Sequence, residues 1–284
     1  MTPTQPTELA WQVNGLRLAG LGWGRRDARP VLALHGWLDN AASFSMLAPL
    51  LDDCYVVALD LTGHGRSACR SRDATYQIWD DVPEILGVVD ALGWQQFSLL
   101  GHSRGAIIAS LVAASFPERI ARLIKLDAIM PLPVAESRFP SQLREFVGQK
   151  RHWLARENTV FTSIDTAVES RIRGGLNAAA ARLLVERNLR PCAGGFTWTT
   201  DLRLRGASAV KLTAGQNQAV LEALVMPQLL MLTEDSLRHR EDLLASAVQF
   251  CPGMELAIVE GGHHFHMEPG VGTVATQISQ FLQG

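Results

Sequence analysis

A chain of 284 residues, 47% of them hydrophobic and 19% charged, is long enough for one large core or two smaller ones and too apolar to be disordered. Its 26 lysines and arginines are balanced by 28 acidic residues, so the net charge of -2 offers no basic surface to a phosphate backbone. We therefore expect a globular protein that does not bind nucleic acid.

The start of the chain, MTPTQPTELAWQVNG, has neither the basic nor the apolar segment of a secretion signal. No stretch reaches the ~18 consecutive apolar residues of a membrane helix, so we expect a cytoplasmic location and no membrane partner. The four cysteines lack the spacing of a zinc or disulfide framework, and we expect buried free thiols at Cys54, Cys69, Cys192 and Cys251.

Short apolar runs alternate with helical patterns along most of the chain. This alternation is typical of parallel strands joined by crossover helices, and it predicts a doubly wound α/β fold. The segment VGTVATQISQFLQ has apolar residues at helical spacing and predicts a closing helix. The predicted strands are residues 8–13, 17–23, 30–34, 55–60, 97–101, 120–127, 227–233 and 254–260.

Residues 131–222 have a different pattern. Segments such as SQLREFVGQKRHWLARE and NAAAARLLVERNL favour helix, with no strong strand between them. Proline and glycine in MPLP and PCAGG indicate chain reversals at the entry and in the middle of the region. We interpret it as an inserted helical cap that divides an α/β core into residues 1–130 and 223–284.

The segment LLGHSRGAIIAS places Ser103 between Gly101 and Gly105. G-x-S-x-G occurs by chance often enough to be weak evidence alone. Here a predicted strand precedes the serine and a predicted helix follows it, which is the setting of a nucleophile held in a tight, strained turn. We therefore predict that Ser103 is a nucleophile.

A serine hydroxyl needs a general base, which such a fold places in a loop after the last strand. The segment VEGGHHFHMEP lies there. We predict His263 as the base because it follows the Gly-Gly that ends the strand, and keep His264 as the alternative. His266 is better interpreted as a structural residue. We interpret His35, His64 and His102 as hydrogen-bonding turn residues, and His152 and His239 as residues on helix surfaces.

Stabilising the oxyanion of an acyl-transfer reaction takes two backbone N–H groups. One is predicted at Arg104, directly after the nucleophile, at the start of the next helix. The second is predicted at Trp37, in the HGW segment that follows the third strand. The Trp37 indole would either form a wall of the acyl pocket or pack in the core.

These motifs have the order found in the α/β-hydrolase superfamily, which the chain resembles over residues 8–283. The matching segments are LHGWLDNAASF, DLTGHGRS, GHSRG and GGHHFHMEP. GGFTWTTDLRLR in the insertion also resembles a stretch of the serine hydrolase-like branch, which lies near the epoxide hydrolases and haloalkane dehalogenases. The resemblance implies a mostly parallel eight-stranded sheet with helices on both faces and an inserted cap. Epoxide opening and dehalogenation are not expected, because those relatives use an aspartate where this chain has serine.

The resemblance leaves the third member of the triad open. In most of the superfamily the acid follows the seventh strand, but PQLLMLTEDS places Ser236 at that position. The other location that the superfamily uses is the end of the sixth strand, where LIKLDAIMP places Asp127. We favour Asp127, with Asp235 and then Glu234 as alternatives and Ser236 as an auxiliary hydrogen-bonding residue.

The activity that the resemblance implies is acyl transfer without a cofactor or metal, on small or medium carboxylic esters. DLTGHGRS lacks the spacing of a phosphate-binding loop. Aromatic residues of the insertion suggest a largely apolar pocket: Phe139, Phe146, Trp153, Phe161, Phe196 and Trp198. We expect a monomer or homodimer. Two alternatives stay open, a carbon–carbon bond or lactone hydrolase with the same triad and a non-catalytic protein that binds small ligands on a hydrolase scaffold.

Overall fold

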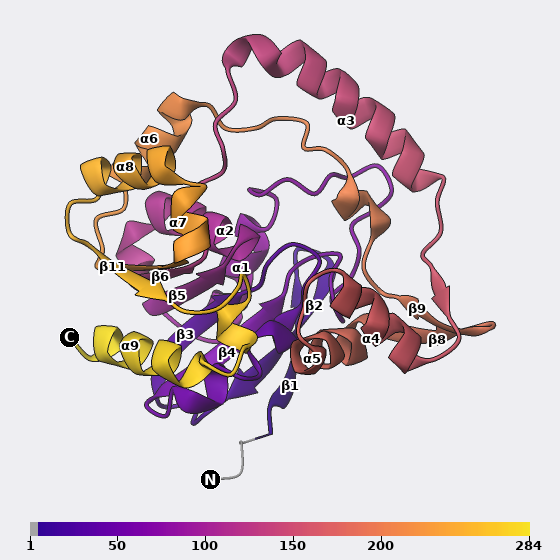
Figure 1. The fold of residues 1–284 in the computed structure, drawn as a ribbon, viewed down its shortest axis with the longest axis horizontal. Helices are drawn as coiled ribbons and strands as arrows, with labels where there is room; N and C mark the ends of the chain where they lie inside the picture. The colour runs from indigo at the N-terminus through magenta and orange to yellow at the C-terminus, as the bar shows by residue number, and fades with distance from the viewer. Residues whose placement is uncertain (1–4) are drawn as a thin grey trace.

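The computed structural model describes residues 5–284 (Figure 1), so the first four residues of the predicted core segment 1–130 lie outside the described residues. An eight-stranded sheet has the order β1-β2-β4-β3-β5-β6-β10-β11. Each predicted strand is present, and its ends lie within one residue of the prediction. The strands are β1 (Thr7–Val13), β2 (Leu16–Trp23), β3 (Arg29–Leu34), β4 (Cys54–Asp60), β5 (Phe97–His102), β6 (Ile120–Leu126), β10 (Gln228–Thr233) and β11 (Met254–Val259).

The sheet is mostly parallel. Antiparallel pairing joins β1 to β2 and β2 to β4, and the remaining neighbours pair in parallel. A parallel pair needs a crossover connection, which explains why strands and helices alternate along the sequence. The predicted α/β fold class is confirmed.

Apolar layers cover both faces of the sheet. On one face, Leu32 of β3 and Leu99 of β5 belong to a core formed with α1 (Val82–Ala91), α2 (Arg104–Ser115), α6 (Ala214–Glu222) and α8 (Glu241–Phe250). On the other face, Ala33 and Leu100 belong to a core formed with the closing helix α9 (Val271–Gln283). Strands covered on both faces have continuous apolar sequences, which is why these runs were recognisable. Among residues 5–284, no helix combines the length and apolarity needed to cross a bilayer.

The region predicted as a helical cap contains helices α3 (Phe139–Leu154), α4 (Ile164–Arg173) and α5 (Ala178–Asn188). Figure 1 shows α3 at the top, away from α4 and α5 at the right. It also contains a small antiparallel sheet, which the sequence interpretation missed because its strands are so short. Its strands are β7 (Val160–Phe161), β8 (Leu189–Cys192) and β9 (Gly195–Trp198).

The boundary at residue 222 also differs from the structure. Helix α6 lies inside the predicted cap, but its Leu221 is 2% exposed and packs in the core layer with α2 and α8. The helix therefore covers the sheet, and the outlying part of the insertion ends before it. The prediction of four buried free thiols is also only partly correct. Cys54 and Cys251 are buried, whereas Cys192 is half-buried and Cys69 is exposed.

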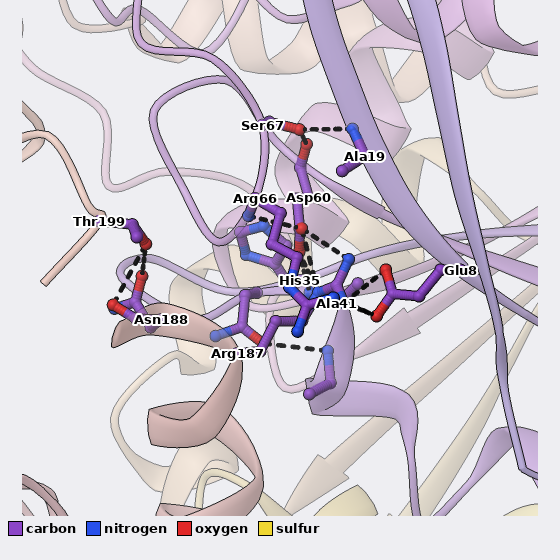
Figure 2. Close-up of polar contacts among 12 residues, drawn as sticks. Glu8, Ala19, His35, Ala41, Asp60, Arg66, Ser67, Arg187, Asn188 and Thr199 are labelled. Atoms are coloured by element: carbon purple, nitrogen blue, oxygen red, sulfur yellow. Dashed lines mark hydrogen bonds and ion pairs between the residues drawn. The ribbon is translucent and has the colours of Figure 1, made fainter. Parts of the chain in front are cut away.

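A buried ion cluster joins α5 to the main sheet (Figure 2). Arg187 of α5 donates from Nε to both carboxylate oxygens of Asp60, each at 3.0 Å, and from Nη1 to Glu8 at 2.9 Å. The Arg187 side chain is 4% exposed and that of Asp60 is fully buried. Asp60 also accepts from the backbone N–H groups of Ala41 and Arg66, at 2.7 and 2.9 Å. One carboxylate therefore holds together the cap and two loops at the edge of the sheet.

Replacing Arg187 with methionine keeps much of the aliphatic length but leaves Asp60 buried without its cation. Breaking a buried pair in this way costs about 3–5 kcal/mol, and we expect the free energy of unfolding in urea to fall by that amount. Arg182→Met on the same helix is the matched control, because its side chain is 50% exposed and such pairs contribute about 0–1 kcal/mol. Equal losses in the two variants would contradict the anchoring role of Arg187.

Candidate active site

Ser103 lies at a sharp turn between β5 and α2. Its φ of 52° and ψ of -119° are unfavourable for a side chain with a Cβ, so the turn is strained. A Cβ on Gly101 would lie 2.4 Å from the Ala106 Cα, and one on Gly105 would lie 2.1 Å from the Leu34 carbonyl oxygen. Both glycines are therefore required by close backbone contacts, and the G-x-S-x-G pattern has a direct steric cause.

The structure brings Ser103, His263 and Asp127 together. The Ser103 Oγ lies 3.0 Å from the His263 Nε2, and the His263 Nδ1 donates to the Asp127 Oδ2. A carboxylate only accepts hydrogen bonds, so this contact places the imidazole proton on Nδ1 and leaves Nε2 free to accept the serine proton. The predicted nucleophile, base and orienting acid thus lie in one continuous hydrogen-bonded array.

Asp127 follows β6 and is fully buried, with a φ of 53°. Its backbone N–H donates to the Met231 carbonyl at 2.9 Å, and its own carbonyl accepts from Arg240. Burial raises the pKa of the carboxyl, but the hydrogen bond from His263, together with Ser236 and the nearby Arg240, holds it below its ordinary value. The carboxylate is therefore ionised where it faces the imidazole, and the auxiliary role of Ser236 stays a prediction.

The alternative acids point elsewhere. Asp235 and Glu234 begin α7 (Glu234–Arg238), with side chains 82% and 78% exposed, and pair with His239 and Arg238 of the same segment. Thr233 caps this helix through a 3.2 Å hydrogen bond from the Ser236 N–H, so the chain turns into a helix directly after β10. The structure brings neither carboxylate to His263.

The other two histidines of the late loop have structural contacts. His264, the alternative base, donates from Nε2 to the Asp39 Oδ2 at 3.0 Å instead of contacting Ser103. His266 is fully buried, and its Nε2 lies 2.9 Å from the Ser43 Oγ. The predicted structural role of His266 agrees with this contact.

The two predicted oxyanion donors lie at the ends of neighbouring parallel strands. Trp37 follows β3, and Arg104 begins α2 directly after β5. Within residues 5–284 neither backbone N–H has a hydrogen-bond acceptor, so both are free to bind an oxyanion. The Trp37 indole is half exposed and donates to the Leu204 carbonyl at 2.8 Å, so it joins the core loop to the cap rather than packing in the core.

A cavity of about 250 Å³ lies between the cap and the loop after Trp37. The sequence suggested an apolar pocket, but Trp198 is the one residue of the six expected aromatics that lines this cavity, and Phe139 is 49% exposed. The cavity is mostly polar instead, and Arg171 and Arg205 both line it. Its remaining lining residues include Leu38, Asn158, Asn188, Thr200 and Leu202.

Asp39 is a residue of the site that the sequence interpretation missed. Its carboxylate is 2% exposed and binds Arg171 of α4 at 2.6 Å through Oδ1 and His264 through Oδ2. Burial raises its pKa, but these two partners together hold it far below the ordinary value. The available sequence signal for Asp39 was an acidic residue in LHGWLDN, two residues after Trp37. Its partners could not be read from the sequence, because they lie more than 100 residues away.

The sheet order, the strained serine turn and the hydrogen-bonded array of Ser103, His263 and the buried Asp127 define an α/β hydrolase. The sequence profile of the alpha/beta hydrolase fold matches residues 29–269, and the chain belongs to this family. Within it the chain falls in the serine hydrolase-like branch. The serine hydrolase-like protein of Danio rerio is 31% identical over 278 residues, which cover 94% of this chain and 85% of the relative. Serine hydrolase-like protein 2 of Homo sapiens is 35% identical over 212 residues, which cover 71% and 66%.

Solved structures show the same fold. The hypothetical protein PA1622 from Pseudomonas aeruginosa PAO1 has a TM-score of 0.92 and 37% identity, with 99% of this chain and 100% of that chain covered. The thioesterase domain from the curacin biosynthetic pathway has a TM-score of 0.84 and 26% identity, with 97% and 99% covered. The chain is therefore a hydrolase-family protein along nearly its whole length.

Proposed function

We propose that the protein is a serine hydrolase that cleaves small or medium carboxylic esters through an acyl-enzyme on Ser103. The observation that carries the proposal is the continuous array from Ser103 through His263 to the buried, ionised Asp127. A non-catalytic binding protein would not need this array or the strained turn that presents the serine. The cytoplasmic location and the monomeric or homodimeric state remain predictions from the sequence.

The proposed reaction has two halves. The His263 Nε2 takes the proton of Ser103 as Oγ attacks the ester carbonyl, while Asp127 stabilises the imidazolium through Nδ1. The N–H groups of Trp37 and Arg104 hold the oxyanion, and the imidazolium then protonates the leaving alcohol. Water attacks the acyl-enzyme with His263 again as base, which releases the acid and restores the serine.

The test combines turnover with covalent labelling. We expect the purified protein to hydrolyse a chromogenic short-chain ester and to be labelled by a fluorophosphonate on Ser103, located by mass spectrometry. A lactone and a ring-cleavage diketone assayed in parallel address the alternative hydrolase activities with the same triad. If Ser103 is labelled but only the lactone or only the diketone is turned over, that activity would replace the ester assignment. If the protein is not labelled and turns over no substrate, a binding protein would be favoured.

The cavity beside the oxyanion loop favours esters with a negatively charged group. Arg171 is already paired with Asp39, whereas Arg205 has no acidic partner among residues 5–284. Burial, and then repulsion from the nearby Arg171, lower the pKa of Arg205. A carboxylate or similar anion on the substrate would relieve that repulsion and gain charge-assisted hydrogen bonds.

We expect Arg205→Gln to lower kcat/KM for an ester that carries a free carboxylate, and to leave a neutral ester of similar size nearly unaffected. A hydrogen bond to a charged group contributes about 1.5–3 kcal/mol, which corresponds to a loss of roughly 10–100-fold. Arg173→Gln is the control, because this arginine lies on α4 with a side chain 71% exposed. Parallel losses on both esters would instead indicate a structural role for Arg205.

A further inference from the structure

A cluster of two histidines and an aspartate lies behind the triad. It consists of Asp39 in the loop after β3, His102 at the end of β5 and His264 in the loop after β11. One ligand-type atom from each residue, a carboxylate oxygen or an imidazole nitrogen, lies within 4.8 Å of the others. His102 immediately precedes the nucleophile and His264 immediately follows the base, so the cluster joins the loops that form the active site.

His102 has a free lone pair aimed into this cluster. The residue is fully buried, and its Nε2 lies 2.8 Å from the His263 carbonyl oxygen. A carbonyl only accepts, so Nε2 carries the proton and Nδ1 has a lone pair. Among residues 5–284 that Nδ1 has no hydrogen-bond partner. A buried polar atom without a partner is uncommon and calls for an explanation.

The same hydrogen bond prepares His102 as a metal ligand. Histidines that bind metals almost always donate their other ring N–H to a carbonyl or carboxylate, which fixes the tautomer. Asp39 has a matching arrangement, because Arg171 binds its Oδ1 and leaves Oδ2 directed at the cluster. In both residues, one polar atom is held by a hydrogen bond or ion pair outside the cluster. The other polar atom, His102 Nδ1 or Asp39 Oδ2, is then available to bind an ion.

The space between these atoms is kept open by a glycine. A Cβ on Gly36 would lie 2.9 Å from the His102 Nδ1 and 3.2 Å from the Asp39 Oδ2. Tetrahedral zinc with ligand distances near 2.0–2.1 Å separates its ligand atoms by about 3.3 Å, so small side-chain rotations are enough to close the cluster on an ion.

We propose that Asp39, His102 and His264 form a binding site for a divalent transition-metal ion, with Zn²⁺ as the best match. Two imidazole nitrogens and one carboxylate oxygen suit zinc and its neighbours, whereas Mg²⁺ and Ca²⁺ require mostly oxygen ligands. On binding, the His264 proton moves from Nε2 to Nδ1, so that Nε2 binds the ion. The ion connects the loop after β3 that carries Trp37, the turn that carries Ser103 and the loop after β11 that carries His263. It thereby fixes the positions of the three parts of the active site relative to one another.

The proposal is tested by isothermal titration of the chelator-treated full chain with ZnCl₂. We expect one equivalent to bind with a dissociation constant below roughly 100 µM, a modest affinity because the ion must displace the hydrogen bond between His264 Nε2 and Asp39 Oδ2. Zinc should raise the melting temperature as its concentration increases, because it binds only the folded chain. MgCl₂ should give neither effect. Absence of one-to-one zinc binding, or equal binding of magnesium, would overturn the site.

Variants locate the ion independently of hydrolysis. We expect His264→Gln and Asp39→Asn to weaken zinc binding at least tenfold, with circular dichroism checking that each is folded. His263→Gln removes the proposed base but should still bind zinc. The zinc site can therefore be confirmed even if the hydrolase proposal fails. Cys69→Ser and His239→Gln control for an exposed thiol and an exposed imidazole. Loss of binding in His263→Gln, or full binding in His264→Gln, would place the ion elsewhere.

Discussion

We expect Ser103→Ala to lower kcat for a chromogenic short-chain ester by about 10⁴-fold or more, with little change in KM. The hydroxyl is the only proposed group that bonds to the substrate carbon, and His263 has no other described nucleophile at its Nε2. Some rate over water should remain, because the Trp37 and Arg104 N–H groups would still bind the oxyanion and position the ester for attack by water. Hydrolysis is measured under saturating and limiting substrate, which separates kcat from KM.

Two controls make the Ser103 result specific. Ser141→Ala removes an exposed hydroxyl whose contact is the Arg138 carbonyl, and it should leave turnover unchanged. Thermal unfolding should show that Ser103→Ala is folded and at least as stable as the parent, since alanine removes no core contact. Full activity in Ser103→Ala would rule out the acyl-enzyme mechanism.

The sheet and the serine turn could be predicted because their causes are local in the sequence. Strands such as β5 are covered on both faces and are apolar throughout, so their limits are visible as runs. Gly101 is required by its contact with Ala106 and Gly105 by its contact with Leu34 of the neighbouring strand β3, but the G-x-S-x-G spacing that results is itself local. His263 could be predicted because the loop that follows the last strand of such a fold lies at the same edge as the serine.

The small sheet of the cap and the polar cavity could not be predicted in the same way. Strand β7 has two residues, which no periodicity can reveal. Arg171 looks like a surface residue in its helical sequence, and only the approach of α4 to Asp39 makes it a half-buried partner of that carboxylate. The aromatic residues of the insertion indicated an apolar pocket because composition does not show which side chains face the core and which face the cavity.

The choice between Asp127 and Asp235 depends on the turns after β6 and β10, and no sequence pattern predicts the geometry of these turns. Asp127 contacts His263 from a backbone with positive φ, which is unusual for a residue other than glycine. Asp235 is excluded because Thr233 starts a helix that directs it into solvent. The sequence placed both carboxylates at the correct edge of the sheet, and the turns decided between them.

Asp127→Asn should therefore be nearly inactive, with kcat lower by about 10⁴-fold, whereas Asp235→Asn should keep full activity. The asparagine amide can donate its N–H to the His263 Nδ1, which moves the imidazole proton to Nε2. An imidazole protonated at Nε2 cannot accept the proton of Ser103, even though the shape of the site is preserved. The 82% exposure of Asp235 makes it a matched control for the same chemical change. Equal losses in the two variants, or full activity in Asp127→Asn, would show that the imidazole is oriented by another group.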